Sequence, residues 1–176
     1  MELSEQNAAK KSVTHSRIGE RLRQKLEELI GRYVSRMRAD PVIPEARSLS
    51  IAVLEDHAMS FLGDLFQSLV VVESDDDLTD EDEADLLGDG SDIQKLISDL
   101  HGRQRHKYGW TQSGLEREYQ ILDEEVEALV RRYVPDTAGP GGVAWALGLL
   151  KRHIKRSRDA SFAGYAAAAA SSNAAR

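Results

Sequence analysis

The chain has 176 residues, enough for one domain, and 41% of them are hydrophobic, so a sizeable and mainly aliphatic core is expected. It contains no cysteine, which excludes disulfides, thiolate metal ligands and a cysteine nucleophile. The net charge of −7 argues against general nucleic-acid binding, and no apolar run is long enough to span a membrane, so we expect a cytoplasmic protein.

The first predicted helix covers Ser16–Met37, after a polar N-terminus (residues 1–15) that we expect to be flexible. Apolar residues recur there at steps of three and four, which is typical of a helix with one buried face. That stripe comprises Ile18, Leu22, Leu26, Leu29, Ile30, Tyr33 and Met37. Asp40-Pro41 is expected to end the helix, because proline disfavours the helical conformation of the residue before it.

A second helix is predicted over Ser50–Val72, with Ser50 as its N-cap. Its broad apolar face runs from Leu54 to Leu69 and includes His57. We interpret His57 as a core histidine; the alternative is a residue that lines a ligand pocket.

Residues 73–85 contain nine carboxylates and no basic residue, which predicts an acidic loop that continues to residue 90. The third predicted helix covers Asp92–Lys107. Its expected buried face comprises Ile93, Leu96, Ile97 and Leu100.

Gly109 is expected to break the third helix. A capping box of Ser113 and Glu116 predicts the start of a fourth helix, whose apolar stripe extends to Val134. The proline- and glycine-rich segment 135–142 reads as a linker.

The last predicted helix covers Val143–Ala170, followed by a frayed tail (171–176). With every element helical, the sequence predicts an all-α fold. We expect about five helices in a globin-like bundle, forming one sensor domain over residues 16–170 with a long C-terminal helix.

A run of residues in the middle of the chain resembles a known signature. It reads His-Gly-x-x-Arg, then a glycine-aromatic break, then a helix with Glu-Tyr. The matching residues are His101, Gly102, Arg105, Gly109, Trp110, Leu115, Glu118 and Tyr119, with Leu49, Leu54, Glu55-Asp56-His57, Arg38, Asp40-Pro41 and Ile43-Pro44 upstream. In order and spacing, this pattern is similar to that of the RsbRD-type N-terminal domains of bacterial stressosome co-antagonists and of some histidine kinases.

The resemblance covers about Ile18 to Tyr165. It implies a dimeric, globin-like sensory domain without haem, followed by an output domain, either a phosphorylatable STAS domain or a histidine kinase. The chain ends at Arg176, so we expect either a fragment of a longer protein or a domain that acts alone.

His101 directly follows Leu100, the last residue of the apolar face of the third predicted helix. One helical turn separates His101 from Arg105, and we predict that both contact Glu118 on the next helix. The alternative makes His101 the iron ligand of a haem-binding, globin-type gas sensor. His101 and His106 are not at the spacing of a helical metal pair, so no metal site is expected.

The sequence contains no catalytic motif, and the spacing of its titratable residues does not indicate an acid–base pair. We therefore expect a protein that is not an enzyme. The leading hypothesis is a signal-sensing module that forms a homodimer through its terminal helices and passes a signal to a kinase or stressosome-type output. Its signature and pocket candidates are His57, His101, Arg105, Trp110, Glu118 and Tyr119.

Overall fold

The structure, a computed structural model, describes residues 18–55, 58–74, 91–136 and 142–174. Over these residues every regular element is a helix and none is a strand, which confirms the all-α class. The elements are a helical turn at 18–23, α2 (Leu26–Ala39), the short 3-10 helix η1 (Pro44–Arg47), α3 (Ile51–Glu55), α4 (Ala58–Ser74), α6 (Ser91–Lys107), α7 (Gln112–Tyr133) and α8 (Val143–Ala174).

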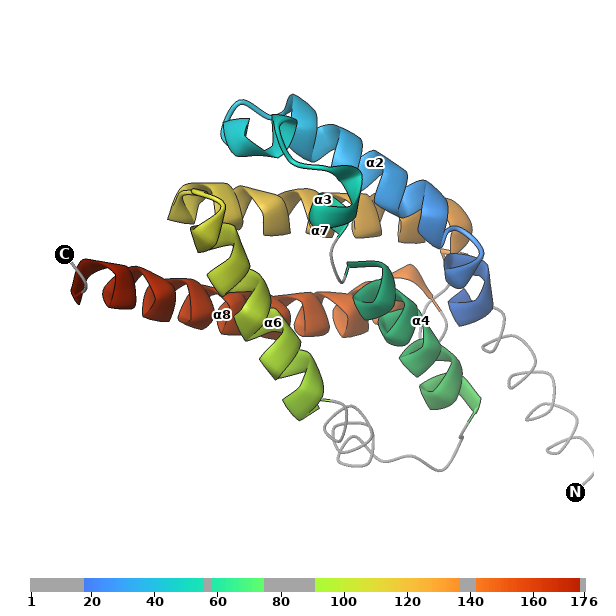
Figure 1. Cartoon of the computed structure of the whole chain (residues 1–176). Helices are drawn as coiled ribbons and strands as arrows, with labels where there is room; N and C mark the ends of the chain where they lie inside the picture. Colours follow the sequence, from blue (N-terminus) through green and yellow to red (C-terminus); the bar gives the residue numbers. More distant parts are fainter. Residues whose placement is uncertain (1–17, 56–57, 75–90, 137–141, 175–176) are drawn as a thin grey trace, which may run out of the picture.

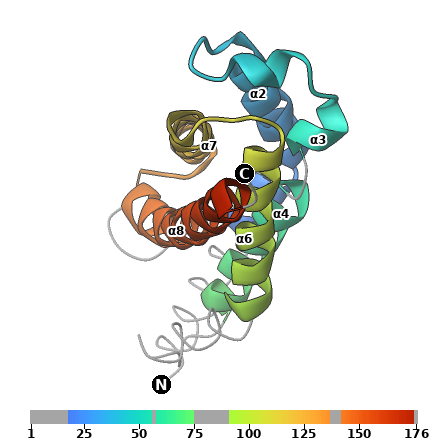
Figure 2. The same ribbon diagram turned by 60° about the vertical axis from the view of Figure 1, so that its left-hand side comes forward.

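Three helices form the body of the fold, with α2 packed on α7 and α7 packed on α8 (Figure 1). Helices α6 and α4 lie across one side of this stack, and α6 crosses α8 (Figures 1 and 2). The core between them is aliphatic, as composition predicted. No described helix is both long and apolar enough to cross a bilayer.

The interface between α2 and α7 combines an apolar stripe with ion pairs at its edge. Tyr33 and Met37 of α2 are buried, as the sequence predicted. Beside them, the buried carboxylate of Glu125 on α7 lies 2.8 Å from Arg32 Nε and 2.9 Å from Arg36 Nη1 of α2. These contacts fix the rotation of α2, and with it the direction in which Tyr33 points.

The first predicted helix is interrupted at residues 24–25, so the prediction of one continuous helix from Ser16 was wrong over the described residues. The N–H of Lys25 donates to the carbonyl of Leu22, a tighter bond than the helical one, and α2 begins at Leu26. Ile18 and Leu22 are nevertheless buried, because the apolar stripe continues across this turn. Helix α2 then ends at Ala39, before Asp40-Pro41.

The second predicted helix is divided into α3 and α4. Ser50 Oγ accepts a hydrogen bond from the N–H of Val53 (3.3 Å), which matches the predicted cap. Residues 56–57, and therefore His57, lie outside the described residues, as do 75–90 of the predicted acidic loop. Glu73 and Ser74, which the sequence predicted to lie in that loop, belong to α4.

The predicted inward face of α6 was wrong. Ile93, Leu96 and Leu100 are 67%, 59% and 55% exposed, and Ile97 is only half-buried. The buried face of α6 contains Ser98, His101, Gly102 and Arg105 instead. The reason is the close crossing with α8, which requires small and polar side chains, as described below.

Gly109 ends α6 as predicted, with a φ of 84° that only glycine adopts readily. The N–H of Trp110 donates to the carbonyl of Arg105, and that of Gly109 to His106, the bond pair of a Schellman motif. Helix α7 begins earlier than predicted, because Thr111 and not Ser113 is its N-cap. Thr111 Oγ1 accepts from the N–H of Gly114 at 3.0 Å.

Helix α8 is the longest element, with 32 residues. It begins at Val143, as predicted, and continues to Ala174, beyond the expected end at Ala170. The alanine-rich stretch before Ala170 has high helix propensity and carries the helix into the residues predicted to fray. Most of the predicted linker, residues 137–141, lies outside the described residues.

Candidate functional site

A buried ion pair between α6 and α7 forms the centre of the candidate site. Arg105 is 0% exposed and Glu118 is 1% exposed. Arg105 Nε lies 3.1 Å from Glu118 Oε2, and Arg105 Nη2 lies 2.8 Å from Oε1, so the two planar groups meet in a bidentate fork. The predicted contact between these residues is therefore confirmed.

Two further guanidinium donors of Arg105 bind the backbone at the C-terminal end of α3. Nη1 donates to the carbonyl of Val53 at 3.0 Å, and Nη2 to that of Leu54 at 3.3 Å. Carbonyls near a helix C-terminus carry partial negative charge, which suits a cation. Arg105 thus links α3, α6 and α7.

Trp110 covers the guanidinium from one side. The ring lies 4.8 Å from Arg105 Cζ, within the range of a cation–π contact. The turn at Gly109 places Trp110 there, and Tyr165 of α8 donates to the Trp110 carbonyl at 2.7 Å. A predicted signature residue therefore packs directly on the ion pair.

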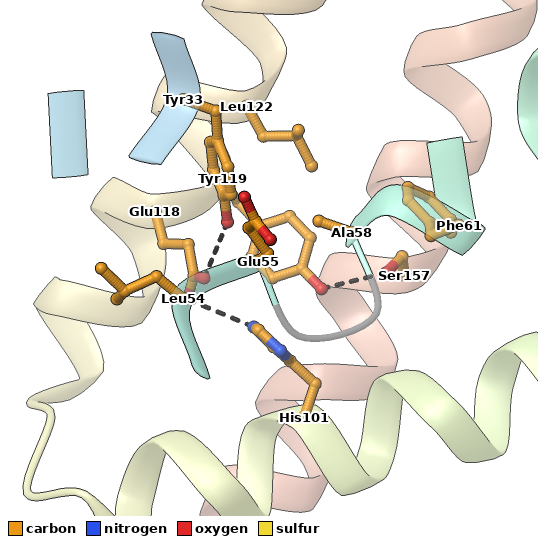
Figure 3. A pocket seen from close by; sticks show the side chains of 10 residues that line it. All are labelled: Tyr33, Leu54, Glu55, Ala58, Phe61, His101, Glu118, Tyr119, Leu122 and Ser157. Carbon is orange, nitrogen blue, oxygen red and sulfur yellow. Dashed lines mark hydrogen bonds and ion pairs between the residues drawn. The ribbon is translucent and has the colours of Figure 1, made fainter. Parts of the chain in front are cut away.

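Two more side chains donate to or contact Glu118. Tyr33 Oη of α2 donates to Glu118 Oε1 at 2.8 Å, and His101 Nε2 lies 3.2 Å from Oε2 (Figure 3). Burial alone would raise the pKa of Glu118, but the charges of Arg105 and His101 and their hydrogen bonds outweigh it and hold that pKa well below its ordinary value. Burial, followed by the Glu118 charge, raises the pKa of Tyr33 well above its ordinary value.

A cluster of hydroxyl groups connects this centre to α8. Tyr119 Oη lies 2.9 Å from Ser157 Oγ and 2.7 Å from Ser161 Oγ. Ser98 of α6 closes the cluster: its Oγ is 2.9 Å from Ser157 Oγ, and its carbonyl accepts from Ser161 Oγ at 2.7 Å. We call Ser98, Tyr119, Ser157 and Ser161 the hydroxyl cluster.

Two glycines allow the backbones of α6 and α8 to touch at this cluster. A Cβ on Gly102 would overlap the carbonyl oxygen of Ser161 and lie 2.6 Å from the carbonyl carbon of the same residue. A Cβ on Gly164 would similarly overlap the Asp99 carbonyl. This approach explains why the buried face of α6 carries serine, glycine and polar side chains in place of leucines.

A small cavity lies between the ion pair and the hydroxyl cluster (Figure 3). Tyr33, Phe61, His101, Glu118 and Ser157 are among its lining residues. Its volume of about 20 Å³ matches the space of one water molecule.

The cavity beside His101 is small. Cofactor pockets occupy roughly 300–1,000 Å³, far more than this cavity offers. His101 is 6% exposed, and its Nε2 lies 3.2 Å from Glu118 Oε2.

The structure brings together His101, Arg105, Trp110, Glu118 and Tyr119, all candidates from the sequence. Sequence reasoning missed Tyr33 and the serines of the hydroxyl cluster. Tyr33 is part of an apolar stripe and gives no separate signal. A signal for the serines did exist, because Ser98, His101, Gly102 and Arg105 form a polar stripe at helical spacing on α6.

A second histidine, His153 of α8, is expected to make the stability of the fold depend on pH. Burial, followed by the charges of Arg156 and Arg152, lowers the pKa of His153 from 6.5 to about 4. Between these values the unfolded chain binds more protons than the folded one, so the free energy of unfolding falls as pH falls.

We expect His153→Gln to remove this contribution, so that the free energy of unfolding changes less between pH 6.5 and about 4. Urea unfolding at stepped pH measures it. A variant whose pH dependence equals that of the wild type would show that His153 titrates as freely when folded as when unfolded.

Comparison with protein family models, curated proteins and solved structures finds no match to this chain. Among the described residues, no group of three or more histidine and carboxylate side chains is placed to hold a metal ion.

Proposed function

We propose that the chain is a non-catalytic signal-sensing module that passes a change in helix packing through α8 to an output protein. The proposal rests on two adjacent residues of α7 that make buried polar contacts with different helices. Glu118 pairs with Arg105 of α6, and the neighbouring Tyr119 contacts Ser157 and Ser161 of α8.

The hydroxyl cluster suits a relay because its bonds can be exchanged. Each hydroxyl both donates and accepts, so a small shift of α8 can replace one hydrogen bond by another without leaving a buried group unpaired. A relay requires two packings of similar energy, each favoured differently by a ligand or partner. An apolar contact between α6 and α8 would lack this exchange.

Helix α8 is suited to carry the shift outward. Its 32 residues span about 48 Å, and residues 171–174 at its end are exposed. A rigid helix that contacts the hydroxyl cluster near its middle turns a small internal movement into displacement of its end. We propose a kinase or a stressosome-type protein as the output and a cytoplasmic homodimer as the working form, in agreement with the RsbRD-type resemblance.

The distance between α2 and α8 tests the relay. Because the chain has no cysteine, Ser35→Cys on α2 and Ser172→Cys on α8 give two specific spin-label sites, both exposed. In this labelled chain, diluted with unlabelled protein, we expect Tyr119→Phe to shift the distance distribution or add a second population. The variant removes the hydroxyl that holds Ser157 and Ser161.

Tyr108→Phe is the matched control, because Tyr108 is exposed at the end of α6. It should leave the distribution unchanged. If Tyr119→Phe gives the wild-type distribution while its stability falls, the hydroxyl cluster holds the fold together without relaying anything.

A further inference from the structure

Helix α6 exposes an apolar stripe that no other described part of the chain covers. Ile93, Leu96 and Leu100 are spaced by three and four residues, lie on one face, and are each more than half exposed. We call these three residues the α6 stripe. Exposed apolar residues grouped in this way mark interaction surfaces more often than singly scattered ones.

The terminal helices offer no comparable surface. In the described chain, neither α2 nor α8 has an exposed large apolar side chain. Apart from the α6 stripe, the exposed large apolar side chains are those of Val42, Ile51, Met59 and Tyr108. These four belong to different elements, whereas the α6 stripe is contiguous on one helix. A dimer of the proposed sensor therefore has its best apolar surface on α6.

We propose that the α6 stripe binds the α6 stripe of a second copy of this chain, with the two helices antiparallel. A twofold axis makes each contact occur twice, so the surface must complement itself. In this arrangement Ile93 lies opposite the partner's Leu100, and Leu96 lies beside the partner's Leu96 at the axis.

The charges beside the stripe favour this orientation. Along one flank of α6 they alternate in sign: Asp92, Lys95, Asp99 and Arg103. With Leu96 at the axis, the reversed helix places the partner's Arg103 roughly 4–5 Å along the helix from the level of Asp92, and the partner's Asp99 roughly 3 Å from the level of Lys95, offsets that the long arginine and lysine side chains can span. In a parallel twofold pair this flank would lie on opposite sides of the dimer, so the charges would not pair with one another. Complementary charges of this kind fix orientation more than they add affinity.

Arg103 is already positioned for such a role. Its Nε donates to Asp99 Oδ2 at 2.6 Å within the same helix, and its side chain is 45% exposed. It can therefore bridge Asp99 of its own chain and Asp92 of the partner. A guanidinium has enough donors to bind two carboxylates at once.

The size of the surface predicts a weak dimer. Helix α6 has 17 residues and is about 25 Å long, so the paired helices alone form an interface at the small end of specific complexes. This inference rests on the homodimer of the proposed function but not on the relay, which operates within one chain.

Disulfide cross-linking under mild oxidation tests the pairing and its direction. We expect Leu96→Cys to form a covalent dimer readily, because its two copies meet at the axis. Ile93→Cys should not cross-link to itself, since its copies are offset by roughly 10 Å along the helices, beyond disulfide reach. A mixture of Ile93→Cys and Leu100→Cys chains should form the heterodimer.

Ser35→Cys, exposed on α2, measures random collision, and circular dichroism checks that each variant is folded. Self-linking of Ile93→Cys and Leu100→Cys as readily as of Leu96→Cys would overturn the antiparallel arrangement. Cross-linking of Leu96→Cys no faster than Ser35→Cys would overturn the interface.

Sedimentation equilibrium of the full chain gives an independent readout. Leu96→Glu should weaken self-association by about tenfold or more, because each dimer would bury two carboxylates in place of two leucines. A dimer unaffected by Leu96→Glu would place the interface elsewhere and leave the proposed function intact. A strictly monomeric wild type at hundreds of micromolar overturns both this inference and the homodimer, but not the relay.

Discussion

Glu118→Gln is expected to lower the free energy of unfolding by about 3–5 kcal/mol, a large part of the total stability of a domain this size. The substitution keeps the shape of the side chain but removes the buried carboxylate that meets Arg105 at 2.8 Å. It also weakens the acceptor for Tyr33 and His101. Urea unfolding followed by circular dichroism measures the loss.

Glu116→Gln is the matched control, because Glu116 lies on the same helix and its side chain is 40% exposed. It should change stability by less than about 0.5 kcal/mol. The double variant Arg105→Met/Glu118→Gln should lose less than the sum of its two single variants, since it leaves no buried charge unpaired. Equal losses for Glu116→Gln and Glu118→Gln would mean that the ion pair is solvated.

Gly102→Ala is expected to destabilise the fold by about 1–3 kcal/mol, although alanine is the better helix former. Its methyl group would overlap the backbone of Ser161 and lie 2.9 Å from the nitrogen of Tyr165, so α6 and α8 must separate. Because the neighbouring atoms are backbone, no side-chain rotation relieves the overlap. Thermal and urea unfolding both measure the effect.

Gly148→Ala gives the opposite expectation on α8 itself. Its added Cβ would meet only Arg152 Nη1, at 3.7 Å, so the gain in helix propensity of about 0.5–1 kcal/mol should appear as higher stability. If Gly102→Ala stabilises the protein as Gly148→Ala does, the two helices do not approach each other as closely as described.

Local patterns predicted most of the secondary structure but not its interruptions. The stripes of α2 and α7 follow from apolar spacing, and the end of α6 follows from Gly109. The turn at residues 24–25 has no such signal, because Gln24 and Lys25 both favour helix. The start of α7 was placed too late because Thr111 and Ser113 are both acceptable caps.

Hydrophobic spacing predicts the wrong buried face for α6, because that face depends on the packing of another helix. Hydrophobic periodicity assigns Ile93, Leu96 and Leu100 to the core. The backbone contact made possible by Gly102 and Gly164 reverses that assignment, and it joins residues distant in sequence.

The candidate site was only partly predictable, because some of its contacts join neighbouring helices and others join helices distant in sequence. His101, Arg105 and Glu118 lie on consecutive helices joined by a short turn, so spacing alone indicated their contact. The bond from Tyr33 to Glu118 spans 85 residues and depends on how α2 packs.

We propose that the polar centre and α8 move together, and the label distance between positions 35 and 172 reports that movement. We predict that Tyr119→Phe displaces α8 relative to α2 while Tyr108→Phe does not. Identical distance distributions in the wild type and in both variants would contradict the claim.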